Sequence, residues 1–229
     1  MSDDDTGAVQ AGQRLRDSLV VLLAIGSGAA DVTAFLVLGN VFSSVITGNL
    51  VLLGLAAATT QPGLAMRSGL ALAGYAAGVL IGVPVAGRGR HRIWPPAVTA
   101  ALCAELCLLL GFTAGWEAGR QRPGWQAALL VLLGSAMGVQ SAAVRRLGDM
   151  SSTYLTGTLT GVLTALSTRN RRAGLWRDVS ALAAVLAGAC AGAALIHIAP
   201  AWLPALTLLP LSTVITASRR LRRGTASGT

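Results

Sequence analysis

The sequence predicts an all-α, polytopic membrane protein made of two inverted repeats, each with three crossings and one broken, re-entrant half-helix. Three observations predict this fold: the apolar composition, an internal duplication and the positions of the arginine clusters. Hydrophobic residues make up 53% of the 229 positions, whereas charged residues supply only 12%. A water-soluble protein of this size needs a more highly charged surface, so we expect this chain to use lipid as its solvent.

Apolar segments recur along nearly the whole chain and leave no stretch long enough for an independent soluble domain. They run approximately over residues 19–39, 42–58, 68–86, 95–114, 125–144, 151–167, 177–198 and 201–217. The expected organisation is a cytoplasmic N-terminal tail over 1–18, a first membrane repeat over 19–114, an external loop over 115–124, a second membrane repeat over 125–217 and a basic cytoplasmic tail over 218–229.

The net charge of +9 would suggest a nucleic-acid partner in a soluble protein. Here the arginines gather at the ends of apolar segments, where positive charge fixes the orientation of a membrane protein. We therefore expect the lipid bilayer as a partner and no nucleic acid.

The chain contains an internal duplication. Sliding it against itself by 109 residues aligns residues 23–56 with residues 132–165 without a gap, and places Thr47-Gly48 on Thr156-Gly157. A shift of 108 extends the match to the last segment of each half, where Trp94 falls on Trp202. Each half therefore holds four apolar segments.

The arginine clusters decide between two topologies. They comprise Arg14 and Arg16; Arg88, Arg90 and Arg92; Arg145 and Arg146; Arg169, Arg171, Arg172 and Arg177; and Arg219, Arg220, Arg222 and Arg223. If the second and sixth segments dip in and return on the same side, all these clusters are cytoplasmic, as the positive-inside rule requires. Three crossings per half then invert the second half relative to the first. The alternative, eight spans in parallel repeats, places two of the clusters outside and is disfavoured.

Geometry supports the two dips. Residues 40–46, extended at about 3.3 Å each, reach past the middle of a hydrocarbon layer about 30 Å thick. Residues 47–58, helical at about 1.5 Å each, climb back about 18 Å. Because broken backbone survives in a membrane only against protein or water, the dips are where we expect function.

Matched motifs stand at the proposed starts of the two half-helices: Thr47, Gly48 and Asn49 in the first half, and Thr156, Gly157 and Thr158 in the second. Threonine can cap a helix, glycine allows close approach, and unpaired N-terminal amides form a locally positive site. We expect the two ends to meet near the membrane midplane. The alternative is that these residues only cap and pack.

Two acids stand inside apolar segments. Asp31 lies in the first crossing, and its equivalent in the second half is Gln140. A carboxylate there is costly unless it is partnered, hydrated or protonated, so Asp31 is the leading candidate for a proton- or cation-responsive group. The alternative is a structural hydrogen bond from Asp31 to the broken backbone of its own half, with Gln140 acting likewise in the other half. Glu105 ranks second, with a role in packing between helices as the equal alternative.

The first-half motif resembles a known family. The stretches Gly28-Ala-Ala-Asp31-Val-Thr-Ala-Phe35, Gly39-Asn-Val-Phe42 and Ile46-Thr-Gly-Asn49-Leu are similar to the YoaK family of bacterial membrane proteins of unknown function. The resemblance covers about residues 19–217, and the second half matches more loosely, with Thr158 in place of asparagine. It implies a small multi-spanning membrane protein without an assigned substrate.

The sequence favours a small-solute or ion transporter or channel of the bacterial inner membrane, with its site at the paired half-helix ends. The alternative is a non-transporting scaffold or partner subunit, and a homo-oligomer is left open. No catalytic triad, phosphate loop or zinc signature is present, and the three cysteines lack metal-ligand spacing. We therefore expect no enzyme, no metal site and no cofactor.

Overall fold

The computed structural model describes residues 3–87, 93–148, 155–168 and 174–224. Within these ranges all regular structure is helical, which confirms the predicted all-α class. In chain order the elements are α1 (Asp3–Val37), α2 (Ile46–Ala58), α3 (Pro62–Ala86), α4 (Pro96–Gly119), α5 (Pro123–Arg145), α6 (Leu155–Ser167), α7 (Leu175–Ile198), the 3₁₀ helix η2 (Pro200–Trp202) and α8 (Ala205–Gly224).

Six of these helices are long and apolar enough to cross a bilayer, whereas α2 and α6 are not. Each short helix has 13 residues, which at about 1.5 Å per residue covers only about two-thirds of the hydrocarbon layer. The order long, short, long, long therefore occurs twice along the chain. The eight-span alternative needs crossing helices at both short positions, and their length does not support it.

The helix ends follow local sequence. Proline at the first helical position begins α3, α4 and α5, where its fixed φ suits the helix and its missing N–H is not needed. The end of α1 is marked by Gly39 and Asn40, both with positive φ, and the Asn40 amide donates to the Phe35 carbonyl. Such left-handed residues commonly terminate helices.

Several helices extend further than the predicted membrane segments. The predicted tail over 1–18 is continuous with α1, the predicted loop over 115–124 shrinks to residues 120–122, and α8 continues into the predicted tail over 218–229. Hydropathy locates the part of a helix that lipid covers, but a helix can continue into water wherever no proline or turn stops it.

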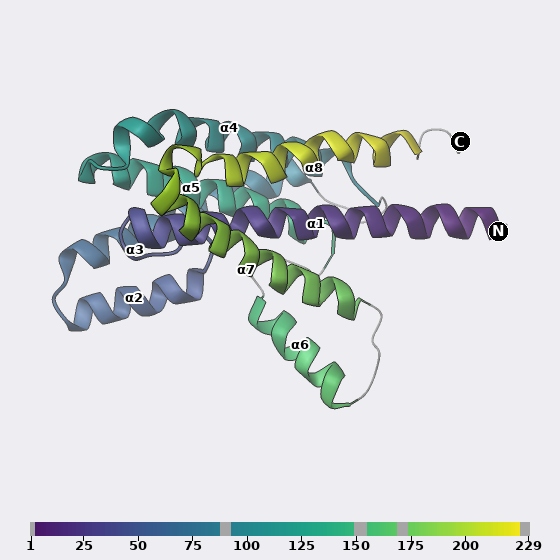
Figure 1. Ribbon diagram of the computed structural model, residues 1–229, viewed down its shortest axis with the longest axis horizontal. Helices are drawn as coiled ribbons and strands as arrows, with labels where there is room; N and C mark the ends of the chain where they lie inside the picture. The colour runs from purple at the N-terminus through teal and green to yellow at the C-terminus, as the bar shows by residue number, and fades with distance from the viewer. Residues whose placement is uncertain (1–2, 88–92, 149–154, 169–173, 225–229) are drawn as a thin grey trace.

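The helix pairs repeat between the halves. The most extensive contacts join α3 to α5 and, at the equivalent place, α7 to α1. The packing of α4 on α5 is likewise equivalent to that of α8 on α1. The packing of α2 on α3 is equivalent to that of α6 on α7. The two halves are thus interlocked, because the later long helices of each half pack on the first helix of the other (Figure 1).

Glycines allow the closest of these contacts. Gly78 of α3 lies against the Ser135 carbonyl of α5, and Gly188 of α7 lies against the Ile25 carbonyl of α1. A Cβ atom at either position would overlap the facing oxygen. In lipid, where the hydrophobic effect does not hold helices together, such close packing supplies much of the attraction.

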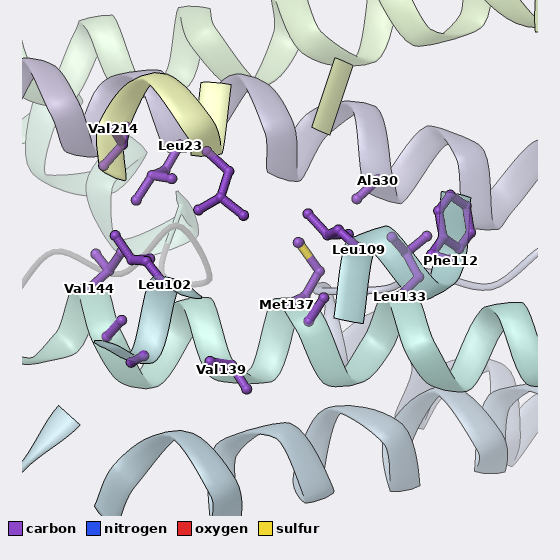
Figure 2. Packing of buried hydrophobic residues seen from close by; sticks show 14 of the residues in the cluster. Leu23, Ala30, Leu102, Leu109, Phe112, Leu133, Met137, Val139, Val144 and Val214 are labelled. Carbon is purple, nitrogen blue, oxygen red and sulfur yellow. The ribbon is translucent and has the colours of Figure 1, made fainter. Parts of the chain in front are cut away.

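The apolar core lies among α1, α4, α5 and α8 (Figure 2). Its labelled members include Leu23, Leu102, Leu109, Phe112, Met137 and Val214. The short helices stand outside this core, on one flank of the long helices (Figure 1). Only two residues in each are buried, so they are held mainly by α3 and α7.

Candidate functional site

The break between α1 and α2 is held by Asp31. Its Oδ1 accepts hydrogen bonds from the Ser43 and Ser44 amides at 2.8 and 2.7 Å and from the Ser43 hydroxyl at 2.9 Å. Its Oδ2 accepts a bond from the Ser44 hydroxyl at 2.6 Å. The carboxylate thereby satisfies two amides that have left helical geometry, which in a membrane would otherwise be costly.

A second clamp fixes the same break. The Asn49 side chain is fully buried; its Oδ1 accepts from the Phe42 amide at 2.9 Å and its Nδ2 donates to the Phe42 carbonyl at 2.6 Å. The Phe42 ring stacks on Phe35, with ring centroids 5.3 Å apart. Asn49 therefore stabilises the chain that leads into α2.

The start of α2 differs from the prediction. Val45 is the N-cap residue, makes no side-chain cap bond, and precedes a helix that begins at Ile46. The prediction that Thr47 caps the helix is wrong by this geometry, and the reason is tertiary. Because Asp31 and Asn49 fix residues 42–44, the helix can begin before the threonine. Thr47 lies one residue inside α2 with an exposed side chain.

A cavity of about 790 Å³ lies between the N-terminal ends of the two short helices. The helix α3 forms one wall, from Tyr75 near its middle to Gly87 just past its end, and the C-terminal part of α5 forms another. The lining residues are Ser44, Val45, Ile46, Thr47, Tyr75, Val79, Val83, Ala86, Gly87, Ser141, Ala142, Arg145, Arg146, Leu155, Thr156 and Gly157.

The cavity brings some of the predicted site residues together and leaves others apart. Thr47, from the first half, shares its lining with Thr156 and Gly157 from the second. Gly48, Asn49 and Thr158 belong to the same motifs but are not among the lining residues, nor are Asp31, Gln140 and Glu105. The two half-helix ends therefore line one cavity, but only part of each motif faces this shared space.

Comparison with known proteins agrees with this architecture. A family described as protein of unknown function (DUF1275) matches residues 19–217. The chain belongs to this family. The UPF0700 transmembrane protein YoaK of Bacillus subtilis is 35% identical over 190 residues, which cover 80% of this chain and 84% of that protein. This confirms the family resemblance carried by the first-half motif, and no solved structure matches the chain.

In this DUF1275 protein Gln140 occupies the position equivalent to Asp31 but has a different partner. Its Nε2 donates to the Ser27 hydroxyl of α1 at 2.7 Å, and both side chains are buried. Gln140 thus joins the first helix of one half to the first helix of the other. Residues 149–154, which the alignment of the two halves places opposite residues 40–45, lie outside the described residues.

Glu105 lies in α4 inside the bundle, 1% exposed. Its Oε2 has no hydrogen-bond partner among the residues that the structure describes. The neighbouring positions along the same face, Leu102 and Leu109, belong to the apolar core. Glu105 is therefore separate from the cavity and from the clamp at Asp31.

Sequence reasoning missed four polar residues that line the cavity: Tyr75, Ser141, Arg145 and Arg146. The arginine pair was interpreted only as an orientation signal, although Arg146 also donates from Nε to the Ala86 carbonyl at the end of α3, at 3.1 Å. The sequence did contain one signal for this pair: the alignment of the two halves places the apolar residues Leu36 and Val37 opposite the arginines. A charged pair in only one half indicates a role that the other half does not share.

Proposed function

We propose that this membrane protein is a transporter or channel for a small solute or ion, and that the cavity between α2 and α6 is its binding site. The single observation that carries the proposal is that the N-terminal ends of two half-helices line one cavity. Broken helices whose ends meet inside a bundle are the usual solute sites of transporters with internal repeats. Cavities of several hundred cubic ångströms are also typical of small-molecule sites.

Helix directions support opposite insertion of the two halves. Contacts of Gly12 with Leu221 and of Gly26 with Thr207 make α1 and α8 antiparallel. The bonds from Thr99 to Ser218 and from Trp116 to the Pro200 carbonyl do the same for α4 and α8. Since α1 therefore runs with α4, and α5 returns antiparallel to α4, the equivalent helices α1 and α5 run in opposite directions.

The proposed membrane orientation places both chain ends in the cytoplasm of a bacterial cell. The start of α1 and the end of α8 lie at the same end of the molecule (Figure 1). Arg14 and Arg16 stand near that end of α1, as the positive-inside rule requires of a cytoplasmic face. In this orientation Arg145 and Arg146 form the cytoplasmic mouth of the cavity.

Cysteine labelling of intact cells tests the orientation. The native cysteines Cys103, Cys107 and Cys190 are first replaced, and a single cysteine is then introduced at position 40, 61 or 145. The native residues at these positions, Asn40, Gln61 and Arg145, are all exposed. We expect an impermeant maleimide to label positions 40 and 61 from outside, and position 145 only after the cells are opened. Labelling of positions 40 and 61 from opposite faces would show that α2 crosses the membrane.

Uptake by proteoliposomes tests the function. Vesicles are incubated with a mixture of small anions, cations and neutral metabolites, and the retained solutes are identified by mass spectrometry. Thr47→Trp should fill the cavity and block uptake, whereas Val51→Trp, one turn further along α2 and away from the cavity, should not. If no solute enters the wild-type vesicles beyond the Thr47→Trp level, the proposal is wrong.

One observation favours the alternative, a non-transporting scaffold. The polar atoms of Asp31 and Asn49 are used in holding residues 42–44, so these two motif residues serve structure. A scaffold predicts that Thr47→Trp leaves every membrane flux unchanged and instead prevents recovery of one consistent partner protein. The same pair of tryptophan variants therefore separates the two functions.

A further inference from the structure

The charged side chains in the described part of the cavity lining are all of one sign. Among its described lining residues Arg145 and Arg146 are cationic and none is acidic. Asp31 stands behind the wall, where its oxygens accept four hydrogen bonds from Ser43 and Ser44. The Asp31 carboxylate is thus not part of the lining, and the described lining residues carry two positive charges and no negative one.

The guanidinium groups are placed at the end of the cavity where α3 and α5 finish. Arg146 is half-buried, and its bond to the Ala86 carbonyl ties it to the end of α3. Arginine presents several N–H donors in a fixed plane that matches the oxygens of a carboxylate or a similar anion. The N-terminal ends of α2 and α6 line the same space and add positive potential to it.

The remaining walls are mainly apolar. Val45 and Ile46 come from α2, Val79 and Val83 from α3, and Leu155 from α6. Tyr75 adds an aromatic ring with a hydroxyl group near the middle of α3. The cavity has a volume of about 790 Å³, which is far larger than an inorganic anion needs. An inorganic anion would therefore make no contact with most of these apolar side chains.

We infer that the cavity binds small organic anions, with the acid group at Arg145 and Arg146 and an apolar body against α2, α3 and α6. The inference rests on the proposed transport function and adds the substrate class. It makes Arg145 and Arg146 specificity residues as well as orientation signals. A cavity for cations would instead be expected to present carboxylates or ordered carbonyl oxygens to its solute.

Matched organic ions of opposite charge test the substrate class. The probes are benzenesulfonate and hexanesulfonate, and phenyltrimethylammonium and hexyltrimethylammonium, which share apolar bodies and keep their charge at every pH. Uptake into proteoliposomes of the full-length protein is measured by mass spectrometry. We expect the sulfonates to enter in preference to the ammonium ions, and Thr47→Trp to abolish their entry.

Arginine variants separate a binding role from a role in orientation. Arg145→Gln should lower sulfonate uptake about tenfold or more, the usual effect of losing one charge-assisted hydrogen bond. Arg145→Lys should restore part of it, and Arg145→Glu should shift the preference toward the ammonium probes. Arg14→Gln removes a charge near the same end of the molecule but outside the cavity, and should leave uptake unchanged.

The outcomes distinguish the two levels of the proposal. Suppose that the ammonium probes enter, or that other solutes of the broad mixture enter while the sulfonates do not, and that Thr47→Trp blocks this entry. That result would overturn the anion assignment and leave the transport function standing. Equal loss of uptake in Arg145→Gln and Arg14→Gln would also overturn it, because orientation alone then explains the arginines. Absence of all uptake in wild-type vesicles would overturn both.

Discussion

The surroundings of Asp31 and Gln140 differ although the two residues occupy equivalent positions in the two halves. Asp31 binds the broken chain of its own half through four hydrogen bonds. Gln140 reaches across to Ser27 in the other half. Among the described residues, one motif position thus fixes a half-helix, while its duplicate joins the halves, so residues at matched positions differ in their described partners.

The difference extends to the positions that follow. In the first half, Leu36 and Val37 close α1 with apolar side chains, whereas the second half has Arg145 and Arg146 at the mouth of the cavity. The first half therefore supplies a rigid, hydrogen-bonded break, and the second supplies the charge. The cavity that both halves line is therefore not symmetric in its chemistry.

The largest effect is expected from removal of the Asp31 carboxylate. Asp31→Ala leaves the Ser43 and Ser44 amides without their acceptor inside a membrane protein, which should cost about 4 kcal/mol or more of unfolding free energy. Gln140→Ala loses one bond to Ser27 and should cost only about 1 kcal/mol. Unfolding in mixed detergent and SDS micelles measures both values, and equal values would contradict the assigned difference in role.

The next largest effect on stability is expected at the close helix contacts that both halves share. Gly78→Val and Gly188→Val each push a side chain into a facing backbone carbonyl, at α3–α5 and α7–α1 respectively. Each should lower the unfolding free energy by about 3 kcal/mol, the upper range for overpacking. Gly54→Val, in α2 with open space around the glycine, is the control and should cost little in the same titration. A large loss at only one of the two crossings would show that the packing of the halves is not equivalent.

A smaller difference is expected at Asn49 and its equivalent Thr158. Asn49→Leu keeps the size of the side chain but removes both bonds to the Phe42 backbone, so it should cost about 2 kcal/mol. Thr158→Val should cost about 1 kcal/mol or less, since a single hydroxyl is lost. The same titration measures both values. If Asn49→Leu does not lower the unfolding free energy, Asn49 does not stabilise the break between α1 and α2.

Much of the fold was predictable from the sequence because it depends on periodic, local features. The arginine clusters separated six expected crossings from two re-entrant segments, which agrees with six crossing-length helices and two short ones, and proline and glycine mark several helix ends. Glycines recur every four residues in two segments, at Gly74, Gly78 and Gly82 and at Gly188 and Gly192, a spacing typical of packed membrane helices, and Gly78 and Gly188 do lie against facing backbone. These features need no knowledge of which helices are neighbours.

The candidate site was less predictable because it depends on contacts between distant segments. Thr47 was expected to cap α2, but Asp31 fixes the preceding chain and moves the helix start to Ile46. Arg145 and Arg146 were missed as lining residues, because a basic pair after a membrane segment has an orienting role whether or not a cavity lies beside it.

The smallest stability effect, and the one that best tests a shared site, is expected from the paired threonines. Thr47→Val and Thr156→Val replace exposed hydroxyl groups on opposite sides of the cavity with methyl groups of similar size, so each should change the unfolding free energy by less than about 0.5 kcal/mol. Solute uptake should nevertheless fall in both variants, because each removes a polar group that faces the solute. Thr213→Val, on α8 and away from the cavity, is the control for loss of an exposed hydroxyl group. If only one of the two cavity variants lowers uptake, the solute contacts one half-helix end, and the duplicated motif contributes to binding on that side alone.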